Sequence, residues 1–551
     1  MTRGPEIANR GFVPKRDGIA DCGSRNADSR DPSDLCARSA WSDLPRDMDS
    51  LVYPLAPCAL QVSPSAFPGA DNSPTCCIRD NPRSAIRNPQ CCFRPGAIFI
   101  ATLWIILVLA GMVLALAQAM RVEAACSANY ASVQKAMAVE QGAIQYVLAC
   151  VDGLDGEAPT DANSPTDGLI IGNGMFWIIR PNFDNELQPD YGIVDEASKI
   201  NISTADQEVL ELLPRMTRED AAAIVDWRDS DEGLTSGGAE STFYMTMPDP
   251  YRCKNAPFET VEELLLVRGM LPEMLYGEDT NRNGMLDENE NDGDESDPPD
   301  NADGVLDRGI YDLVTVYSSE GSSTGSSGSS SGSGAVDVNS ASSDQLRQAF
   351  RNNISEGRIE EVVARTRTMR PFRNVFDFYF RVELTYDEFK LLANDVTANP
   401  RSSRGSSSRS SLRRGLININ TAPRDVLICL PTIGDAEADA IIDRRASRTD
   451  DEGLAWVVQA LPQENAVEIG SIVTSRSYQF SADIVSVSSD GRAFRRCRVV
   501  VDARESPPRV VFRRDLTGLG WPLDPQILTE LRNGADMESV IDETITAREI
   551  R

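Results

Sequence analysis

The sequence predicts an α+β protein with a long N-terminal transmembrane helix, a small β-sheet and an all-α domain inserted into that sheet. Three observations lead to this fold class. One apolar run, residues 97–120, contains no charged side chain and is long enough to cross a bilayer. Strand-like segments occur both early and late in the chain, at 168–202 and 478–513. Three similar helical segments lie between them.

The apolar run predicts a single membrane anchor. It begins directly after Arg94-Pro95-Gly96 and ends before Arg121, and as a helix it would span roughly 36 Å. Helix-compatible residues continue to Leu148, so one helix over 97–150 is expected, half in lipid and half in water. Two interpretations remain open: an ordinary signal anchor, or a prepilin-like leader junction that a peptidase cuts between Gly96 and Ala97. A cleaved secretory signal peptide fits poorly, because the run is too long.

Residues 1–96 do not have the pattern of a folded domain. They are rich in Pro, Ser, Asp and Arg and show no sustained hydrophobic period. We interpret them as an unusually long leader or as an extension from a start codon assigned too far upstream. The alternative is a cytoplasmic regulatory tail.

Composition excludes several functions. The chain carries 54 Lys and Arg against 84 Asp and Glu, a net charge of −30, which disfavours binding to nucleic acid or anionic lipid surfaces. It contains no histidine, so no imidazole can serve as base, triad member or metal ligand. No recognisable catalytic motif occurs, and we expect no enzyme and no catalytic residues. The five cysteines after the anchor allow one disulfide in an oxidising compartment, but the sequence does not choose the pair.

The strand-like segments predict how the sheet is assembled. GLIIGNGMFWIIR at 168–180 reads as a hairpin around Asn173-Gly174, within a β-hairpin segment 151–199. Closing strands are expected within 476–515, at 478–487, 494–503 and 509–513. In the tail, 516–551, one helix is expected at 525–533.

The helical segments are expected at 200–320, 335–400 and 413–475, separated by flexible Ser/Gly-rich linkers at 321–334 and 401–412. Each begins with an extended apolar entry followed by a Ser or Thr that suits a helix N-cap. Each is then expected to form a helix–turn–helix pair. The expected caps are Ser203-Thr204, Ser340 and Thr421, with Pro423 in the first turn of its helix.

These units resemble helix-hairpin-helix, SAM-like repeats. Two anchored families carry such repeats: competence-type DNA receptors and the minor pseudopilin protein K of type II secretion (general secretion pathway protein K, GspK). Over most of residues 94–515 the chain resembles the second, and residues 237–270 are the most specific part. The resemblance is carried by the Gly96 junction, NISTADQEVLELLP, AIVDWRDSDE, GGAESTFYMTMPDPYRCKNAPFETVEELLLVRGM and NINTAPRDVLICLP.

This resemblance implies a pseudopilin-like sheet and a role in protein export. It implies cleavage by prepilin peptidase, a single-pass inner-membrane anchor with a periplasmic bulk, and a place at the pseudopilus tip beside minor pseudopilins I and J. The fifth residue after the junction is Ala101, where most pilin-like subunits have a Glu that neutralises a neighbour's terminal ammonium. Its absence suits a tip subunit with no neighbour above it. A membrane-anchored DNA receptor remains the alternative, although the hairpin turns are poor in Gly and no nucleic acid is expected.

The acidic segment 278–312 predicts bound calcium, because it holds 13 acidic and 2 basic residues. Part of it fits the twelve-residue EF-hand pattern, in which alternate oxygens converge on one ion and a Gly allows the sharp turn. The resemblance to protein K implies calcium in this region as well. A solvated acidic loop is the alternative. The expected ligands are Asp279, Asn281, Asn283, Met285, Asp287 and Glu290, with a possible second cluster of Asp300, Asn301, Asp303 and Asp307.

Overall fold

The computed structural model describes residues 95–320 except 184, 294 and 296–299, residues 336–398 except 352 and 394, and residues 413–542 except 450–451. The chain divides into two units, 1–92 and 93–551, and the described residues belong to the second. The expected leader up to residue 94, both linkers and the end of the tail lie outside the described residues. The described part combines helices and sheet with one long apolar N-terminal helix, which confirms the predicted fold class at this level.

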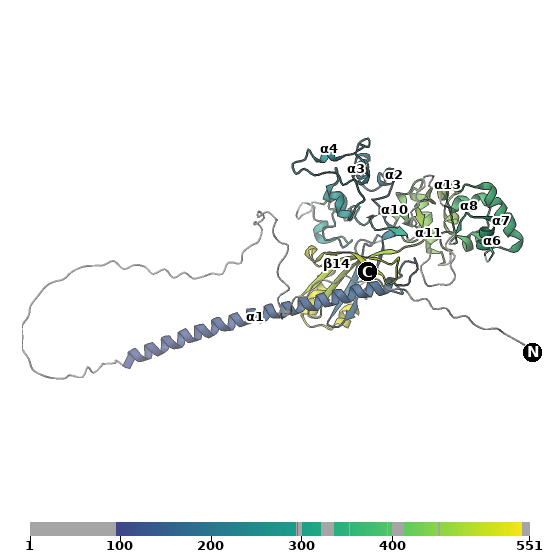
Figure 1. Cartoon of the computed structure of the whole chain (residues 1–551). Coiled ribbons are helices and arrows are strands. Elements are labelled where there is room, and N and C mark those ends of the chain that lie inside the picture. The colour runs from purple at the N-terminus through teal and green to yellow at the C-terminus, as the bar shows by residue number, and fades with distance from the viewer. Residues whose placement is uncertain are drawn as a thin grey trace, which may run out of the picture. The chain divides into compact units, whose positions relative to one another are not determined.

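Helix α1 (Pro95–Val151) is continuous from the apolar run into the body of the protein (Figure 1). Residues 98–120 are exposed on every side, and this helix is the one element of the described chain that is long and apolar enough to span a membrane. In its last turns, small and β-branched side chains recur every three or four residues and pack on the sheet. They are Val139, Ala143, Ile144, Val147 and Val151.

Early and late strands join one antiparallel sheet, as the sequence predicted. The strand order is β1-β2-β13-β14-β15, with β3 paired to β2 and β4 paired to β13. Everything between β4 and β13 is therefore an insertion into this sheet. The strands are β1 (Leu169–Ile171), β2 (Gly174–Arg180), β3 (Asp190–Tyr191), β4 (Val194–Asp195), β13 (Gln479–Ser488), β14 (Phe494–Asp502) and β15 (Arg509–Asp515).

The predicted first hairpin is shifted by one residue. Ile171 pairs with Gly174, so the turn residues are Gly172 and Asn173 rather than Asn173 and Gly174. Gly172 has a φ of 58°, which favours glycine. Gly174 instead begins β2, where a Cβ atom would lie 2.3 Å from the carbonyl oxygen of Val487 on β13. The close approach of the neighbouring strand explains this glycine.

Both faces of the sheet are covered. Along β2, Phe176 and Ile178 face the core under α1, whereas Trp177 and Ile179 face the opposite side. That second face is closed by α14 (Pro525–Arg532), through Ile527, Leu528 and Leu531. The tail helix, which the sequence predicted without a role, therefore completes the core.

The insertion contains three helical units, each closed by a pair of parallel strands. In each unit the entry strand pairs with a Val-Thr strand at the exit. Sequence reasoning missed these exit strands, because two residues give no period. The pairs are β5 (Ile200–Asn201) with β6 (Val314–Thr315), β8 (Val336–Asp337) with β9 (Val396–Thr397), and β11 (Ile417–Asn418) with β12 (Val473–Thr474).

The predicted helix N-caps are wrong in all three units. The first helices begin after Asp206, Ser342 and Pro423. The side chain of the Asn or Asp that ends each entry strand accepts a hydrogen bond from the backbone N–H two residues later, as in Asn201 with Ser203 at 2.9 Å. This Asx turn separates strand from helix. Ser203 closes the first turn, whereas Thr204, Ser340 and Thr421 each lie one residue beyond their turn.

Each unit opens with the predicted helix–turn–helix pair and then differs. The first contains α2 (Gln207–Leu210), α3 (Arg218–Arg228), α4 (Ser241–Tyr244), η2 (Val261–Leu266), α5 (Pro272–Tyr276) and η3 (Glu288–Glu290). The second contains α6 (Ser343–Phe350), α7 (Glu356–Met369), α8 (Val375–Val382) and α9 (Tyr386–Leu392). The third contains α10 (Arg424–Ile428), α11 (Asp435–Ala446), α12 (Val457–Ala460) and α13 (Gln463–Ile469).

A short stem marks where the second unit leaves the others. Strands β7 (Ser319–Glu320) and β10 (Arg413–Arg414) pair antiparallel, so the chain departs and returns at one place. The second unit also packs on the third, where the Asn374 side-chain amide donates to the carbonyl oxygen of Val467 at 2.6 Å. It is therefore a module attached to the other two units.

Buried charges lie at the root of the insertion, where β4 leads into η1 (Glu196–Ser198). The Asp195 carboxylate accepts hydrogen bonds from the side chains of Ser477 and Thr421, both at 2.5 Å, and from Asn418 at 2.9 Å. Glu196 is paired with Lys199 at 3.2 Å and lies 3.7 Å from Arg498. Burial alone would raise the pKa of Glu196, but these two cations and the hydroxyls of Ser481 and Thr315 lower it to about 2.

This depressed pKa predicts a contribution to acid stability. Because the folded pKa of Glu196 lies below its ordinary 4.5, its stabilisation is complete above pH 4.5 and is lost as the pH falls toward 2. We expect Glu196→Gln to remove a pH dependence on the order of 3 kcal/mol from this window. Acid unfolding of the full chain in detergent, followed by circular dichroism, measures it.

The matched control is Glu219→Gln on the exposed surface of α3, which should keep the wild-type acid profile. An unchanged profile for Glu196→Gln would show that this carboxylate does not contribute.

Candidate metal sites and membrane anchor

The predicted calcium loop folds around its own oxygen atoms. The Asp279 carboxylate accepts hydrogen bonds from the backbone N–H groups of Asn283, at 3.1 Å, and Gly284, at 2.8 Å. Asn281 and Asn283 accept from N–H groups two residues ahead, at 2.9 and 2.7 Å. Gly284 has a φ of 73°, the sharp turn that the sixth position requires.

The last positions close the same loop. Glu290 accepts hydrogen bonds from the backbone of Thr280, at 3.0 Å, and of Asp287, at 3.2 Å. The Asp287 carboxylate accepts from the amides of Asn281 and Asn283, at 2.5 and 3.0 Å. The structure thus brings together five of the six predicted ligand side chains; Met285 would contribute its backbone oxygen.

The donor set fits calcium. The side chains of Asp279, Asn281, Asn283, Asp287 and Glu290 accept these hydrogen bonds and keep lone pairs for an ion. Asp279 and Glu290 are almost fully buried, at 5% and 1% exposure. Burial, followed by the charges of Glu290 and Asp312, raises the pKa of Asp279 to about 7. A divalent cation would relieve both the burial cost and the repulsion.

The possible second cluster does not converge in the same way. Asp300, Asn301 and Asp303 each accept an N–H from the residue two positions ahead, at 2.6 to 2.9 Å. Asp307 forms an ion pair with Arg215 on another segment at 2.5 Å. The three turns order the chain here, while Asp307 is directed elsewhere.

A different acidic cluster, which sequence reasoning missed, is formed by Asp226, Asp229 and Glu240. One carboxylate oxygen from each lies within 4.8 Å of the others. Asp226 is on α3, Asp229 caps the end of that helix, and Glu240 precedes α4. Asp226 and Glu240 are 0% and 3% exposed, and both oxygens of Glu240 are buried without a hydrogen-bond partner.

The surroundings of this Asp226 cluster are built for a cation. Burial, and then the charges of Asp226 and Asp229, raise the pKa of Glu240 to about 7. Arg268 does not neutralise the carboxylates; it donates to the carbonyl oxygens of Gly237 and Gly238, at 2.6 and 2.9 Å, and holds the loop over them. Three buried or half-buried carboxylates can hold a divalent cation there.

A sequence signal for this cluster existed. AIVDWRDSDE places acidic residues in the last turn of a predicted helix and just beyond it, where the helix dipole disfavours negative charge. Two acidic residues at such an unfavourable position indicate that a further positive charge compensates for them.

The junction residues Gly96 and Ala97 lie in the first turn of α1. Farther along the helix, Glu140 is 1% exposed and accepts from Arg495 on β14, at 3.2 Å, and Arg513 on β15, at 2.6 Å. These pairs fix the helix to the sheet. The five cysteines of the described residues form no disulfide; all of them are free: Cys126, Cys150, Cys253, Cys429 and Cys497.

The arrangement defines a class of protein: one long apolar helix, of a length that can span a membrane, continues onto an antiparallel sheet that carries an inserted helical domain. Residues 206–276, which include the Asp226 cluster, match the family model of type II secretion system protein K, first domain. Over this segment the chain is similar to the first domain of type II secretion system protein K, which confirms the family resemblance seen in the sequence there.

Among solved structures, the chain is similar to one from the GspK-GspI-GspJ complex of the enterotoxigenic Escherichia coli type 2 secretion system. The identity is 12% and the TM-score 0.34, over 69% of this chain and 96% of that one. No curated protein sequence matches the chain.

If the Asp226 cluster binds calcium, the effect of Glu240→Gln on thermal stability should have opposite signs with and without calcium. In a chelator, Glu240→Gln should raise the thermal unfolding temperature, because an amide removes one charge from a repelling trio. In excess calcium the same change should lower stability relative to wild type, because a ligand oxygen is weakened. Thermal unfolding of the full chain in detergent, in chelator and in calcium, measures both.

Glu208→Gln, on an exposed position of α2, is the control and should behave as wild type in both buffers. If Glu240→Gln has the same effect in both buffers, the cluster does not bind calcium.

Proposed function

We propose that this protein is a minor pseudopilin of a type II secretion system, anchored in the inner membrane with its bulk in the periplasm. The observation that carries the proposal is the protein K domain match at residues 206–276. The form of α1 supports it, because one helix is exposed over the apolar run and packed on the sheet at its other end. Such a helix can join a helical bundle in lipid while presenting a folded body in water.

We propose further that prepilin peptidase cuts after Gly96 and that the subunit lies at the pseudopilus tip. The side chain at the fifth position after the junction is Ala101, which offers no carboxylate to a neighbour's ammonium. A large insertion into the sheet would obstruct addition of another subunit beyond it. Minor pseudopilins I and J are the proposed partners, through the family resemblance.

Calcium is proposed as a structural ion of the 279–290 loop, held by Asp279, Asn281, Asn283, Asp287, Glu290 and the backbone of Met285. The buried carboxylates and the convergent turns support this role. Bound calcium would supply positive charge and fix the loop backbone. The Asp226 cluster is proposed as a second cation site.

A DNA receptor is less well supported. In a DNA-binding helical hairpin, a glycine-rich turn lets backbone N–H groups reach a phosphate. Here the left-handed residues of the first and third hairpin turns are Arg215, with a φ of 59°, and Thr432, with a φ of 63°. Side chains therefore occupy the positions where close backbone approach would be needed, and the chain is strongly acidic.

Cleavage at the junction is the first test. We expect N-terminal sequencing of the membrane-extracted protein to begin at Ala97 only when prepilin peptidase is co-expressed. Gly96→Leu should prevent this cleavage, because a bulky side chain then replaces the glycine directly before the proposed cut. Gly111→Ala, in the same helix with open space around it, is the matched control and should be cut normally. An uncut wild-type chain in both hosts would contradict the pseudopilin proposal.

Calcium binding gives a separate test. Titration calorimetry of the full chain in detergent should show two calcium sites, and Asp279→Asn with Glu290→Gln should remove one. At a free calcium concentration 100 times the Kd, the lost stabilisation should be about 2.7 kcal/mol. Glu208→Gln serves again as the control. An unchanged stoichiometry in the double variant would show that the loop is not a calcium site.

A further inference from the structure

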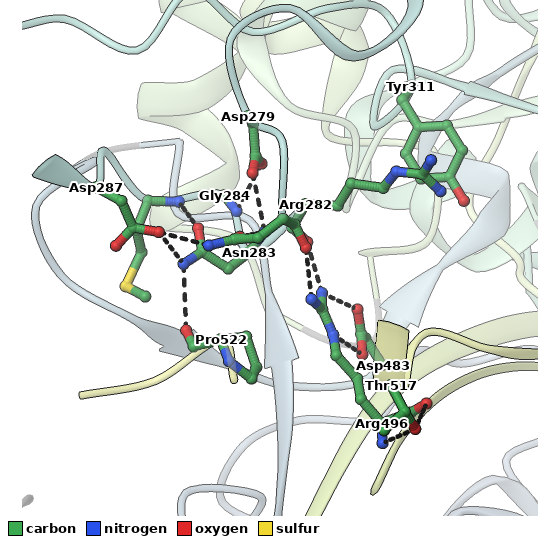
Figure 2. Close-up of polar contacts among 12 residues, drawn as sticks. Asp279, Arg282, Asn283, Gly284, Asp287, Tyr311, Asp483, Arg496, Thr517 and Pro522 are labelled. Atoms are coloured by element: carbon green, nitrogen blue, oxygen red, sulfur yellow. Dashed lines mark hydrogen bonds and ion pairs between the residues drawn. The ribbon is translucent and has the colours of Figure 1, made fainter. Parts of the chain in front are cut away.

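The 279–290 loop also contacts the sheet through the outer side of its backbone. While its side-chain oxygens turn inward, the carbonyl oxygens of Asn281 and Arg282 accept hydrogen bonds from the guanidinium of Arg496 on β14, the second at 2.7 Å. Arg496 is 0% exposed and also pairs with Asp483 on β13, at 2.6 Å. Figure 2 shows Arg282 and Asn283 of the loop, with Asp279 on one side of them and Arg496 and Asp483 on the other.

Further contacts join the same few residues to the sheet side. The Asn283 amide donates to the carbonyl oxygen of Pro522, ahead of α14, at 3.2 Å (Figure 2). The N–H of Leu286 donates to the carbonyl oxygen of Glu186, between β2 and β3, at 2.9 Å. A Cβ on Gly284 would lie 2.7 Å from the Cα of Pro181.

The proposed ion site and the contact between the loop and the sheet therefore involve the same stretch of backbone. Residues 281–283 supply two of the inward oxygens and also the two carbonyls and the amide that hold the sheet side. If the loop opens to separate its buried carboxylates, these outward groups move with it. Arg496 then loses two of its acceptors, and a guanidinium without acceptors is unfavourable when buried.

We propose that cation binding by the 279–290 loop latches the inserted helical domain to the sheet, with Arg496 as the residue that transmits it. This inference rests on the calcium site proposed above. With the ion bound, the loop presents its carbonyls to Arg496 and the two parts form one body. Without the ion, the contact loosens while each part keeps its own core.

Hydrogen–deuterium exchange of the full chain in detergent, in calcium and in chelator, tests this latch. Calcium should slow exchange in the loop and also in the sheet-side segments 182–190 and 515–523. At a free calcium concentration 100 times the Kd, opening of the latched contact should be about a hundred-fold rarer. Helix α11 (Asp435–Ala446) should exchange equally in both conditions.

Two variants distinguish loss of the contact between the loop and the sheet from loss of calcium binding. Arg496→Lys keeps a charge beside Asp483 but cannot reach both carbonyls, so calcium should still bind and protect the loop but no longer the sheet-side segments. Asn283→Asp keeps a ligand oxygen and removes the donor to Pro522, so protection of 515–523 should fall. Arg424→Lys, which removes an arginine paired with Asp435 and Asp439 on the third unit, should change nothing.

The outcomes are distinct. Protection of the loop alone by calcium in the wild type would overturn the latch and leave the calcium site standing. Absence of calcium binding would overturn both, whereas the pseudopilin proposal is decided separately by the cleavage experiment. Calcium-dependent protection of the sheet side that survives in Arg496→Lys would also overturn the latch.

Discussion

The Asp195 carboxylate is the point on which the architecture depends. A chain that leaves a sheet at β4 and returns at β13 must bring two distant segments together. Asp195 does this by accepting hydrogen bonds from Ser477 at the return and from Asn418 and Thr421 at the start of the third unit. Burial raises the pKa of Asp195, and these three donors together with the backbone N–H of Ala197 oppose that effect. Because this buried carboxylate is fully hydrogen-bonded, it fixes the relative positions of the segments that meet at the root of the insertion.

Sequence reasoning recovered what periodicity and length encode. The anchor, the late strands and the paired helices follow from long hydrophobic patterns, and the structure contains them. Sequence reasoning failed where the role of a side chain is set by contacts with residues distant in the sequence. Thr421 looks like a helix cap, yet its hydroxyl binds Asp195, more than two hundred residues earlier. Glu240 carries no local pattern at all, since its role arises only when α3 and the following loop meet.

The buried carboxylates of the chain differ in whether a cationic side chain lies beside them. A net charge of −30 would repel itself if spread evenly. Inside the protein, Glu196 at the root has Lys199 as its partner, and Glu140 on α1 has Arg495 and Arg513. The Asp226 cluster and the 279–290 loop have burial without a matching cation. A solute cation at either place would complete the electrostatics.

Three sets of polar contacts show how α1, the sheet and the helical units are connected, beside others such as the ion pair of Arg514 on β15 with Glu262 in η2. The first, Glu140 with its arginines, fixes α1 to the sheet, and the second is the Asp195 root. Both consist of contacts between side chains of the protein and need no bound ion. The third, Arg496 on the loop carbonyls, depends on a backbone shape that buried carboxylates oppose. Of these three, the third is the one that the proposed cation would strengthen, and it acts on the insertion without involving the pairs that attach the sheet to α1.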